Sequence, residues 1–203
     1  MTNLGADDAE QAAPQRHAPA WLRHAVNRVE NANELDRARA AFGHLAAGLT
    51  NNPTVRDVLR GGSFGHAVHP LLTDYPLGAW ISVTVLDLSG SPRLRPAATL
   101  LTGVGVLGAV PTALSGAAEW EAADPKSQRV GLVHAAVNTS AALCYLASFI
   151  SRLRGRHRYG VAIGLLGGCC AWVGGYLGGH LSLVRKIATA DPAFDEPAAP
   201  TAS

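Results

Sequence analysis

The sequence predicts an all-α membrane protein, a four-span transmembrane helical bundle preceded by an amphipathic helix. Only 16% of the 203 residues are charged, whereas a typical soluble domain has about 25%. Residues 97–118 and 130–151 contain no Asp, Glu, Lys or Arg. A soluble bundle needs a polar outer face, which such stretches cannot supply. The formal net charge of +2 also argues against nucleic-acid binding, which requires a strongly basic surface.

Four apolar segments predict the spans. A span needs about 20 residues to cross roughly 30 Å of hydrocarbon, and each segment reaches that length. The joins between the segments are short and polar, so neighbouring spans run antiparallel. We therefore predict a four-helix domain over residues 63–187, with spans at about 70–89, 97–118, 130–151 and 159–184. The expected location is the plasma membrane, with several passes through it.

An amphipathic segment precedes the bundle at residues 20–62. Its apolar residues recur mostly at spacings of three, four or seven up to Leu49, which predicts a helix. Asn51, Asn52 and Pro53 end that helix, and a short second helix is expected at residues 54–60. The first helix either packs on protein or lies flat on the membrane interface. Residues 1–19 and 188–203 are predicted to be disordered tails.

Small residues recur along the predicted fourth span. In lipid, small residues every four positions let helices pack closely. This spacing predicts a central place in the bundle for residues 159–184, and a surface through which a homo-oligomer can form. The two series are Gly160, Gly164 and Gly168, and, one register over, Gly167, Ala171, Gly175 and Gly179.

Polar residues from all four predicted spans gather on one side of the membrane. An even number of spans puts both termini on one side, here called side A, and the opposite side is side B. Ionisable groups at membrane depth are costly and usually mark functional sites. The side A residues are His66, His69 and Asp74 at the start of the first span, Glu119 and Trp120 at the end of the second, His134 and Asn138 at the start of the third, and His180 at the end of the fourth.

Imidazole and carboxylate groups together suit a transition metal, and two facing histidines suit haem iron. We therefore predict a cofactor on His69, His134 and His180, with Asp74 and Glu119 as further metal ligands and Asn138, His66 and Trp120 in support. Two alternatives stay open: hydrogen-bonded pairs that pin helix ends, and a proton or ion path. No nucleophile–base pair stands out, so no catalytic residue is predicted and the chain is not expected to be an enzyme by itself.

Side B carries Asp87 and many arginines. Asp87 is expected to pair with Arg93 or Arg95, and the run from Arg152 to Arg158 to lie against lipid headgroups. The short side B loops hold six arginines, and six basic residues lie near the span ends on side A. The charge rule for membrane orientation therefore leaves the orientation open.

Several short motifs resemble a known family. They are GHAVHPLLTDYPLGAW at residues 65–80, Leu86-Asp87, PTALSG at 111–116, Glu119-Trp120, GLVH at 131–134, Asn138, and GGHL at 178–181. Over roughly residues 55–186 the chain resembles domain of unknown function 2231, a bacterial membrane-protein family. The resemblance implies a four-span integral membrane protein. Some relatives are joined to Rieske-type iron–sulfur domains, which implies electron transfer, haem or metal in the bundle, and here a redox partner in trans.

Overall fold

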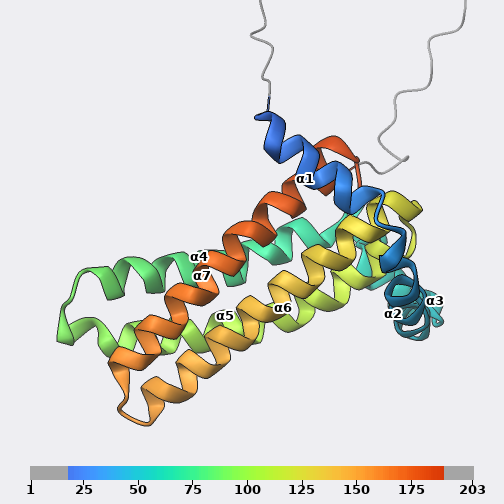
Figure 1. The fold of residues 1–203 in the computed structure, drawn as a ribbon. Helices are drawn as coiled ribbons and strands as arrows, with labels where there is room; N and C mark the ends of the chain where they lie inside the picture. The colour runs from blue at the N-terminus through green and yellow to red at the C-terminus, as the bar shows by residue number, and fades with distance from the viewer. Residues whose placement is uncertain (1–17, 190–203) are drawn as a thin grey trace, which may run out of the picture.

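The computed structural model describes residues 18–189. This part of the chain folds into helices joined by short loops and contains no β-strand (Figure 1). The all-α fold class is confirmed. Apart from residues 18–19 and 188–189, the predicted disordered tails lie outside the described residues. The helices are α1 (Ala20–Glu30), η1 (Asn33–Leu35), α2 (Asp36–Thr50), α3 (Pro53–Arg60), η2 (Gly62–Phe64), α4 (Val68–Leu88), η3 (Pro92–Leu94), α5 (Arg95–Glu121), α6 (Pro125–Leu153), α7 (His157–Gly179) and η4 (His180–Val184).

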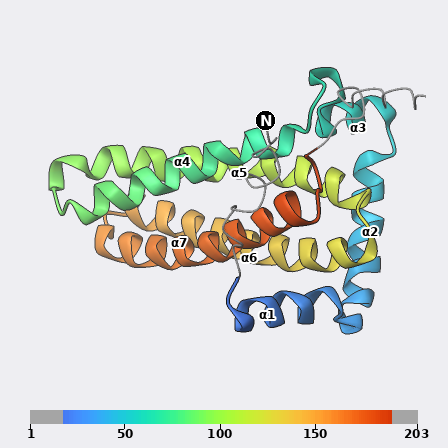
Figure 2. The ribbon, with the colours of Figure 1, turned by 90° about the horizontal axis from the view of Figure 1, so that it is seen from above.

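Helices α4 to α7 form the body of the molecule. α4 and α5 make one antiparallel hairpin, α6 and α7 make another, and the hairpins lie side by side (Figure 2). The loop that joins the two hairpins is short, because α6 begins at Pro125, soon after α5 ends at Glu121. The Asp124 carboxylate caps α6, accepting hydrogen bonds from the backbone N–H of Lys126 at 3.0 Å and of Ser127 at 3.3 Å. Pro125 fills the first helical position, where its missing N–H would have no partner anyway.

Three helical segments are long and apolar enough to cross a membrane. They are Pro92–Glu121, Pro125–Leu153 and His157–Val184. α4, which contains the first predicted span, does not meet the same criterion, so the prediction of four spans is not confirmed. Its composition explains the difference, because Asp74, Asp87, Pro70 and Pro76 interrupt its apolar residues.

The N-terminal segment forms a cap on the side A end of the bundle, where α4 and α6 begin. The single helix predicted for residues 20–49 is broken into α1, η1 and α2, because the chain turns after Glu30 at Asn31, whose side chain donates to the Asn27 carbonyl at 2.7 Å. α2 lies across the end of the bundle (Figure 2), and the predicted short helix is present as α3. The cap therefore packs on protein.

One arginine of α6 holds the cap in place. Arg129 donates from Nε and Nη2 to the two carboxylate oxygens of Asp36, both at 2.9 Å, and from Nη1 to the Glu30 carbonyl at 3.0 Å. The hydrogen bond from Arg129 lowers the pKa of Asp36 despite some desolvation. Both oxygens bind one planar guanidinium, the strongest geometry for such a pair.

The α6–α7 hairpin packs with the seven-residue spacing of a coiled coil. α6 presents mostly polar or large side chains, and α7 presents glycine or alanine where those side chains lie. The facing pairs are Arg152–Gly160, Ser148–Gly164, Tyr145–Gly167, Ala141–Ala171, Asn138–Gly174 and His134–Gly178. The two residue numbers of every pair have the same total, so the helices keep one antiparallel register along their length.

This register corrects the expected four-residue spacing in α7. The contact surface passes from Gly164 to Gly167, because a helical turn has 3.6 residues and a strict four-residue series would drift around the helix. Gly175 and Gly179 lie outside it, with no atom within 4 Å of where a Cβ would stand. The homo-oligomer expected through this helix stays a prediction.

The α4–α5 hairpin is built in the same way. His69 lies against Gly116 and Trp80 against Gly105. Along α4, a histidine, an aromatic ring and a charged residue have the same spacing as in α6. The equivalent residues are His69 and His134, Trp80 and Tyr145, and Asp87 and Arg152.

Equivalent residues also meet across the two hairpins. Trp80 stacks on Tyr145 with ring centroids 4.2 Å apart and planes 8° apart, and Asp87 pairs with Arg152. Equivalent groups meet in this way where a two-fold axis passes between them. The body of the molecule is therefore a tandem repeat of one hairpin, with an approximate two-fold axis along the bundle.

Candidate functional site

Two histidines occupy equivalent places near side A. His69 donates from Nδ1 to the carbonyl of Thr112 at 3.0 Å, and His134 donates from Nδ1 to the carbonyl of Gly174 at 2.9 Å. A carbonyl can only accept, so each neutral ring carries its proton on Nδ1. Each ring lies against a glycine of its own hairpin, His69 against Gly116 and His134 against Gly178. The structure thus gives two of the three predicted histidine ligands the same surroundings.

Asn138 completes the surroundings of His134. Its Nδ2 donates to the backbone carbonyl of His134 at 3.0 Å and lies 3.3 Å from the ring Nδ1 and 3.2 Å from the ring Nε2. Because these two distances are nearly equal, the amide lies against the ring and not in line with one nitrogen. Asn138 lies one turn deeper on the same face, as predicted from its spacing.

His180 has its partner in the cap and not in the bundle. It stands where α7 passes into the π-helical turn η4, and its Nε2 is 2.9 Å from Oε1 of Glu30 in α1. Both side chains are largely buried. His180 therefore links the bundle to the cap, a carboxylate partner that the sequence did not indicate.

The remaining predicted residues are dispersed. Asp74 and His66 are exposed, and Trp120 donates from Nε1 to the carbonyl of Gln128 at 2.7 Å. Glu119 lines a separate groove. Within residues 18–189, no group of three or more His, Cys, Asp or Glu side chains could hold a metal ion. The five predicted metal ligands are therefore not gathered at one site in this part of the chain.

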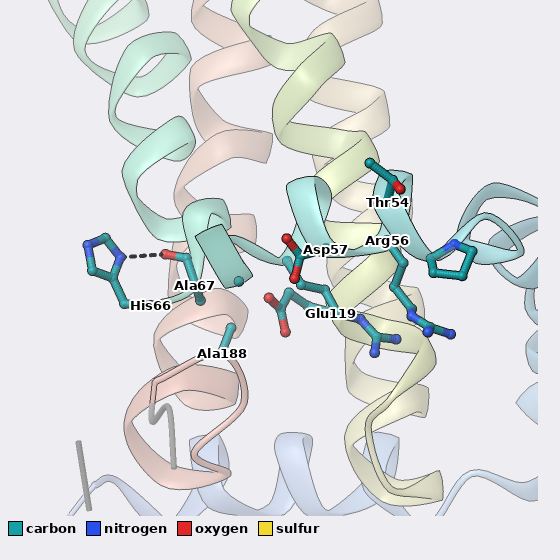
Figure 3. Close-up of a pocket in the computed structure, with 10 residues that line it drawn as sticks. Thr54, Arg56, Asp57, His66, Ala67, Glu119 and Ala188 are labelled. Carbon is teal, nitrogen blue, oxygen red and sulfur yellow. Dashed lines mark hydrogen bonds between the residues drawn. The ribbon is translucent and has the colours of Figure 1, made fainter. Parts of the chain in front are cut away.

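The groove at side A has a volume of about 740 Å³. It opens between α3, the residues that lead into α4, and the last turns of α5 (Figure 3). Arg56, Asp57 and Arg60 of α3 and Glu119 of α5 supply its charged walls. Arg60 donates from Nε to the carbonyl of Ala118 at 3.0 Å and from Nη2 to Glu121 at 2.8 Å, which ties α3 to α5.

Side B holds a buried ion pair in place of the expected surface contacts. The Asp87 carboxylate accepts hydrogen bonds from both terminal nitrogens of Arg152, one of them at 2.9 Å. Their side chains are 3% and 0% exposed. His157 Nε2 lies 3.8 Å from Asp87. The expected pairing of Asp87 with Arg93 or Arg95 was wrong, and Arg152 does not face the headgroups.

A signal for this pair was present in the sequence. Arg152 follows Tyr145 by the interval that separates Asp87 from Trp80, and each charge is the last polar residue before a turn. Comparing α4 with α6 residue by residue would have aligned the two charges. Arg93 and Arg95 were expected as partners of Asp87 only because they follow it closely in the sequence.

A comparison with protein families identifies the family of the four-helix body. The profile described as "Predicted membrane protein (DUF2231)" matches residues 65–191. This range covers α4 to α7, the side A histidines and the side B ion pair. No curated protein and no solved structure matches the chain.

Proposed function

The chain belongs to the DUF2231 family of membrane proteins, and from that premise we propose that it is a structural, partner-organising protein of the plasma membrane whose histidines pin helix ends. The observation that carries this proposal is the set of histidine partners. His69 bridges α4 and α5, His134 bridges α6 and α7, and His180 bridges α7 and α1. Each contact joins two helices near side A.

A fourth span at α4 belongs to this proposal. α4 has 21 residues, about 31 Å at 1.5 Å per residue, which matches the hydrocarbon thickness of about 30 Å. It runs beside α5 (Figure 2). Its buried charge, Asp87, has Arg152 as its partner, so the carboxylate is not left unpaired in a low-dielectric region.

The cap is the part of the molecule that would receive a partner. α1 to α3 stand outside the bundle at side A and are fixed to it by Arg129, Arg60 and His180. Exposed apolar side chains remain on all three helices, at Trp21, Leu45 and Val58. A capture assay from membranes tests this role, because deletion of residues 1–50 should abolish recovery of the partner.

The histidine role is tested by substitution. His69→Ala and His134→Ala should each lower the free energy of unfolding by about 1–2 kcal/mol, the cost of losing a partly buried hydrogen bond. His180→Ala should leave the bundle intact but increase amide hydrogen exchange in α1. His24→Ala is the matched control, since His24 is an exposed histidine of α1. Full stability in all three variants would rule out the pinning role.

A second candidate is the cofactor site on the two equivalent histidines. The observation in its favour is the Nδ1–H···O=C contact of each ring, the arrangement by which proteins orient metal-ligating histidines. A metal or haem on His69 and His134 would make the protein a redox module with a redox protein as partner. Elemental analysis of the detergent-purified, chelator-washed protein decides between the candidates. Stoichiometric iron, copper or zinc that is lost in His134→Ala supports the second.

A further inference from the structure

We propose that the groove at side A binds the headgroup of an amine-bearing phospholipid of the surrounding bilayer, with the phosphate on Arg56 and the ammonium on Glu119 and Asp57. The inference goes beyond the structural role above and does not depend on it. Three observations carry it: the uncommitted charges of the groove, its depth in the membrane and the apolar surface that continues below it.

Two opposite charges in the groove are uncommitted. Among residues 18–189, neither Arg56 nor the half-buried Glu119 forms a side-chain hydrogen bond or ion pair. Asp57 accepts only from Ser63, at 2.9 Å. Glu119 is partly buried, and such a charge without a partner is costly, whereas Arg56 is exposed and free to bind an anion. A ligand that carries both a phosphate and a primary ammonium would satisfy both.

The charges are arranged for such a ligand. Figure 3 shows the carboxylates of Asp57 and Glu119 pointing into one part of the groove, while the Arg56 side chain extends along another part. A guanidinium binds phosphate oxygens in a bidentate manner. A primary ammonium has three donors, enough for two carboxylates at once.

The groove lies at the depth of lipid headgroups. The span Pro92–Glu121 has 30 residues, about 45 Å of helix, which equals the thickness of a bilayer with its headgroups. Glu119 stands two residues before the end of this span. His66 and Ala67, which also line the groove, come directly before α4.

An apolar surface continues from the groove toward the membrane centre. Leu71 and Tyr75 lie one and two helical turns beyond Ala67 along α4, and they are 54% and 65% exposed. Residues four apart share a helix face. An acyl chain attached to a headgroup in the groove would run along this face. A water-soluble compound would leave this face uncovered, whereas a lipid would cover it, which favours a lipid.

The test uses the full-length, delipidated protein in detergent. Native mass spectrometry would measure retention of phosphatidylethanolamine, phosphatidylcholine and phosphatidylglycerol added at equal concentration. Phosphatidylethanolamine should be retained about tenfold better than either of the others, because the choline cation cannot donate hydrogen bonds and glycerol carries no charge. Glu119→Gln should remove the preference over phosphatidylglycerol, and Arg56→Gln should weaken retention of all three.

Glu34→Gln and Arg93→Gln are the matched controls, because both side chains are exposed and lie away from the groove. Equal retention of the three lipids, or a preference that survives Glu119→Gln, would overturn the proposal. Retention of soluble phosphoethanolamine equal to that of phosphatidylethanolamine would also overturn it, because the acyl chain would then contribute nothing to binding. Arg56→Gln and the wild-type lipid series keep the test decisive if Glu119→Gln fails to fold. The histidine variants report on the pinning role separately.

Discussion

The two ends of the bundle are held by different interactions. At side B the ion pair Asp87–Arg152 is almost completely buried and joins the two hairpins. At side A several partly exposed contacts join the bundle to the cap, among them Arg129–Asp36 and Arg60–Glu121. Exposed pairs contribute little individually, whereas removing one partner of a buried pair is costly. We therefore expect the hairpins to stay fixed to each other at side B when the contacts between cap and bundle at side A are broken.

The largest effect is expected at the buried pair. Asp87→Ala leaves Arg152 charged and unpaired and should lower the free energy of unfolding by about 3–5 kcal/mol. Thermal unfolding in detergent measures this loss. The double variant Asp87→Arg with Arg152→Asp should regain most of the stability, because the two positions are equivalent about the axis. A double variant no more stable than the single one would contradict that equivalence.

A smaller loss of stability is expected inside the α4–α5 hairpin. A Cβ at Gly105 would collide with Nε1 of the buried Trp80 ring. Gly105→Ala should therefore cost about 1–3 kcal/mol, as overpacked cores do, and lower the midpoint of thermal unfolding. Gly175→Ala is the control, since a Cβ there meets no atom within 4 Å. Equal effects of the two substitutions would mean that the Trp80–Gly105 contact does not set the helix spacing.

At side A the loss of stability should be confined to the cap. Arg129→Gln removes the bidentate bonds to Asp36 and the bond to the Glu30 carbonyl. We expect amide hydrogen exchange in α1 and α2 to become about ten times faster. The reason is that the free energy that holds the cap on the bundle should fall by roughly 1–2 kcal/mol. Exchange in α6 should stay unchanged. Arg37→Gln, at an exposed position of α2, should have no effect. Global destabilisation by Arg129→Gln would show that cap and bundle unfold together.

The smallest effect is a loss of stability in acid. Desolvation raises the pKa of Asp124, but hydrogen bonds from Ser127 and Arg185 outweigh it and lower the pKa to about 2. A carboxyl whose folded pKa lies below its unfolded value of about 3.9 stabilises the fold above that value and loses the contribution as pH falls toward 2. The loss should be under about 1 kcal/mol, because the side chain is partly exposed. Asp124→Asn should flatten the stability profile between pH 4 and pH 2.

The sequence predicted the helical class and the side A position of the histidines because these follow from residue type and span order. It did not predict the partner of Asp87, since helix phase says nothing about which residue of another hairpin approaches. The break after Glu30 was missed for a related reason. The apolar spacing continues through residues 20–49, and the turn at Asn31 depends on contacts that this spacing does not encode, among them the bond from Arg129 to the Glu30 carbonyl.

The opposite charges at equivalent positions also determine which hairpins pair. Two copies of the α4–α5 hairpin would bring Asp87 against Asp87, and two copies of α6–α7 would bring Arg152 against Arg152. Like charges buried together are strongly unfavourable. Only one hairpin of each kind satisfies both charges, and the short loop that ends at Asp124 keeps the two in one chain. The ion pair thus makes mispairing between like hairpins of neighbouring molecules unfavourable in a crowded membrane, a selectivity that stacked rings and glycines alone would not provide.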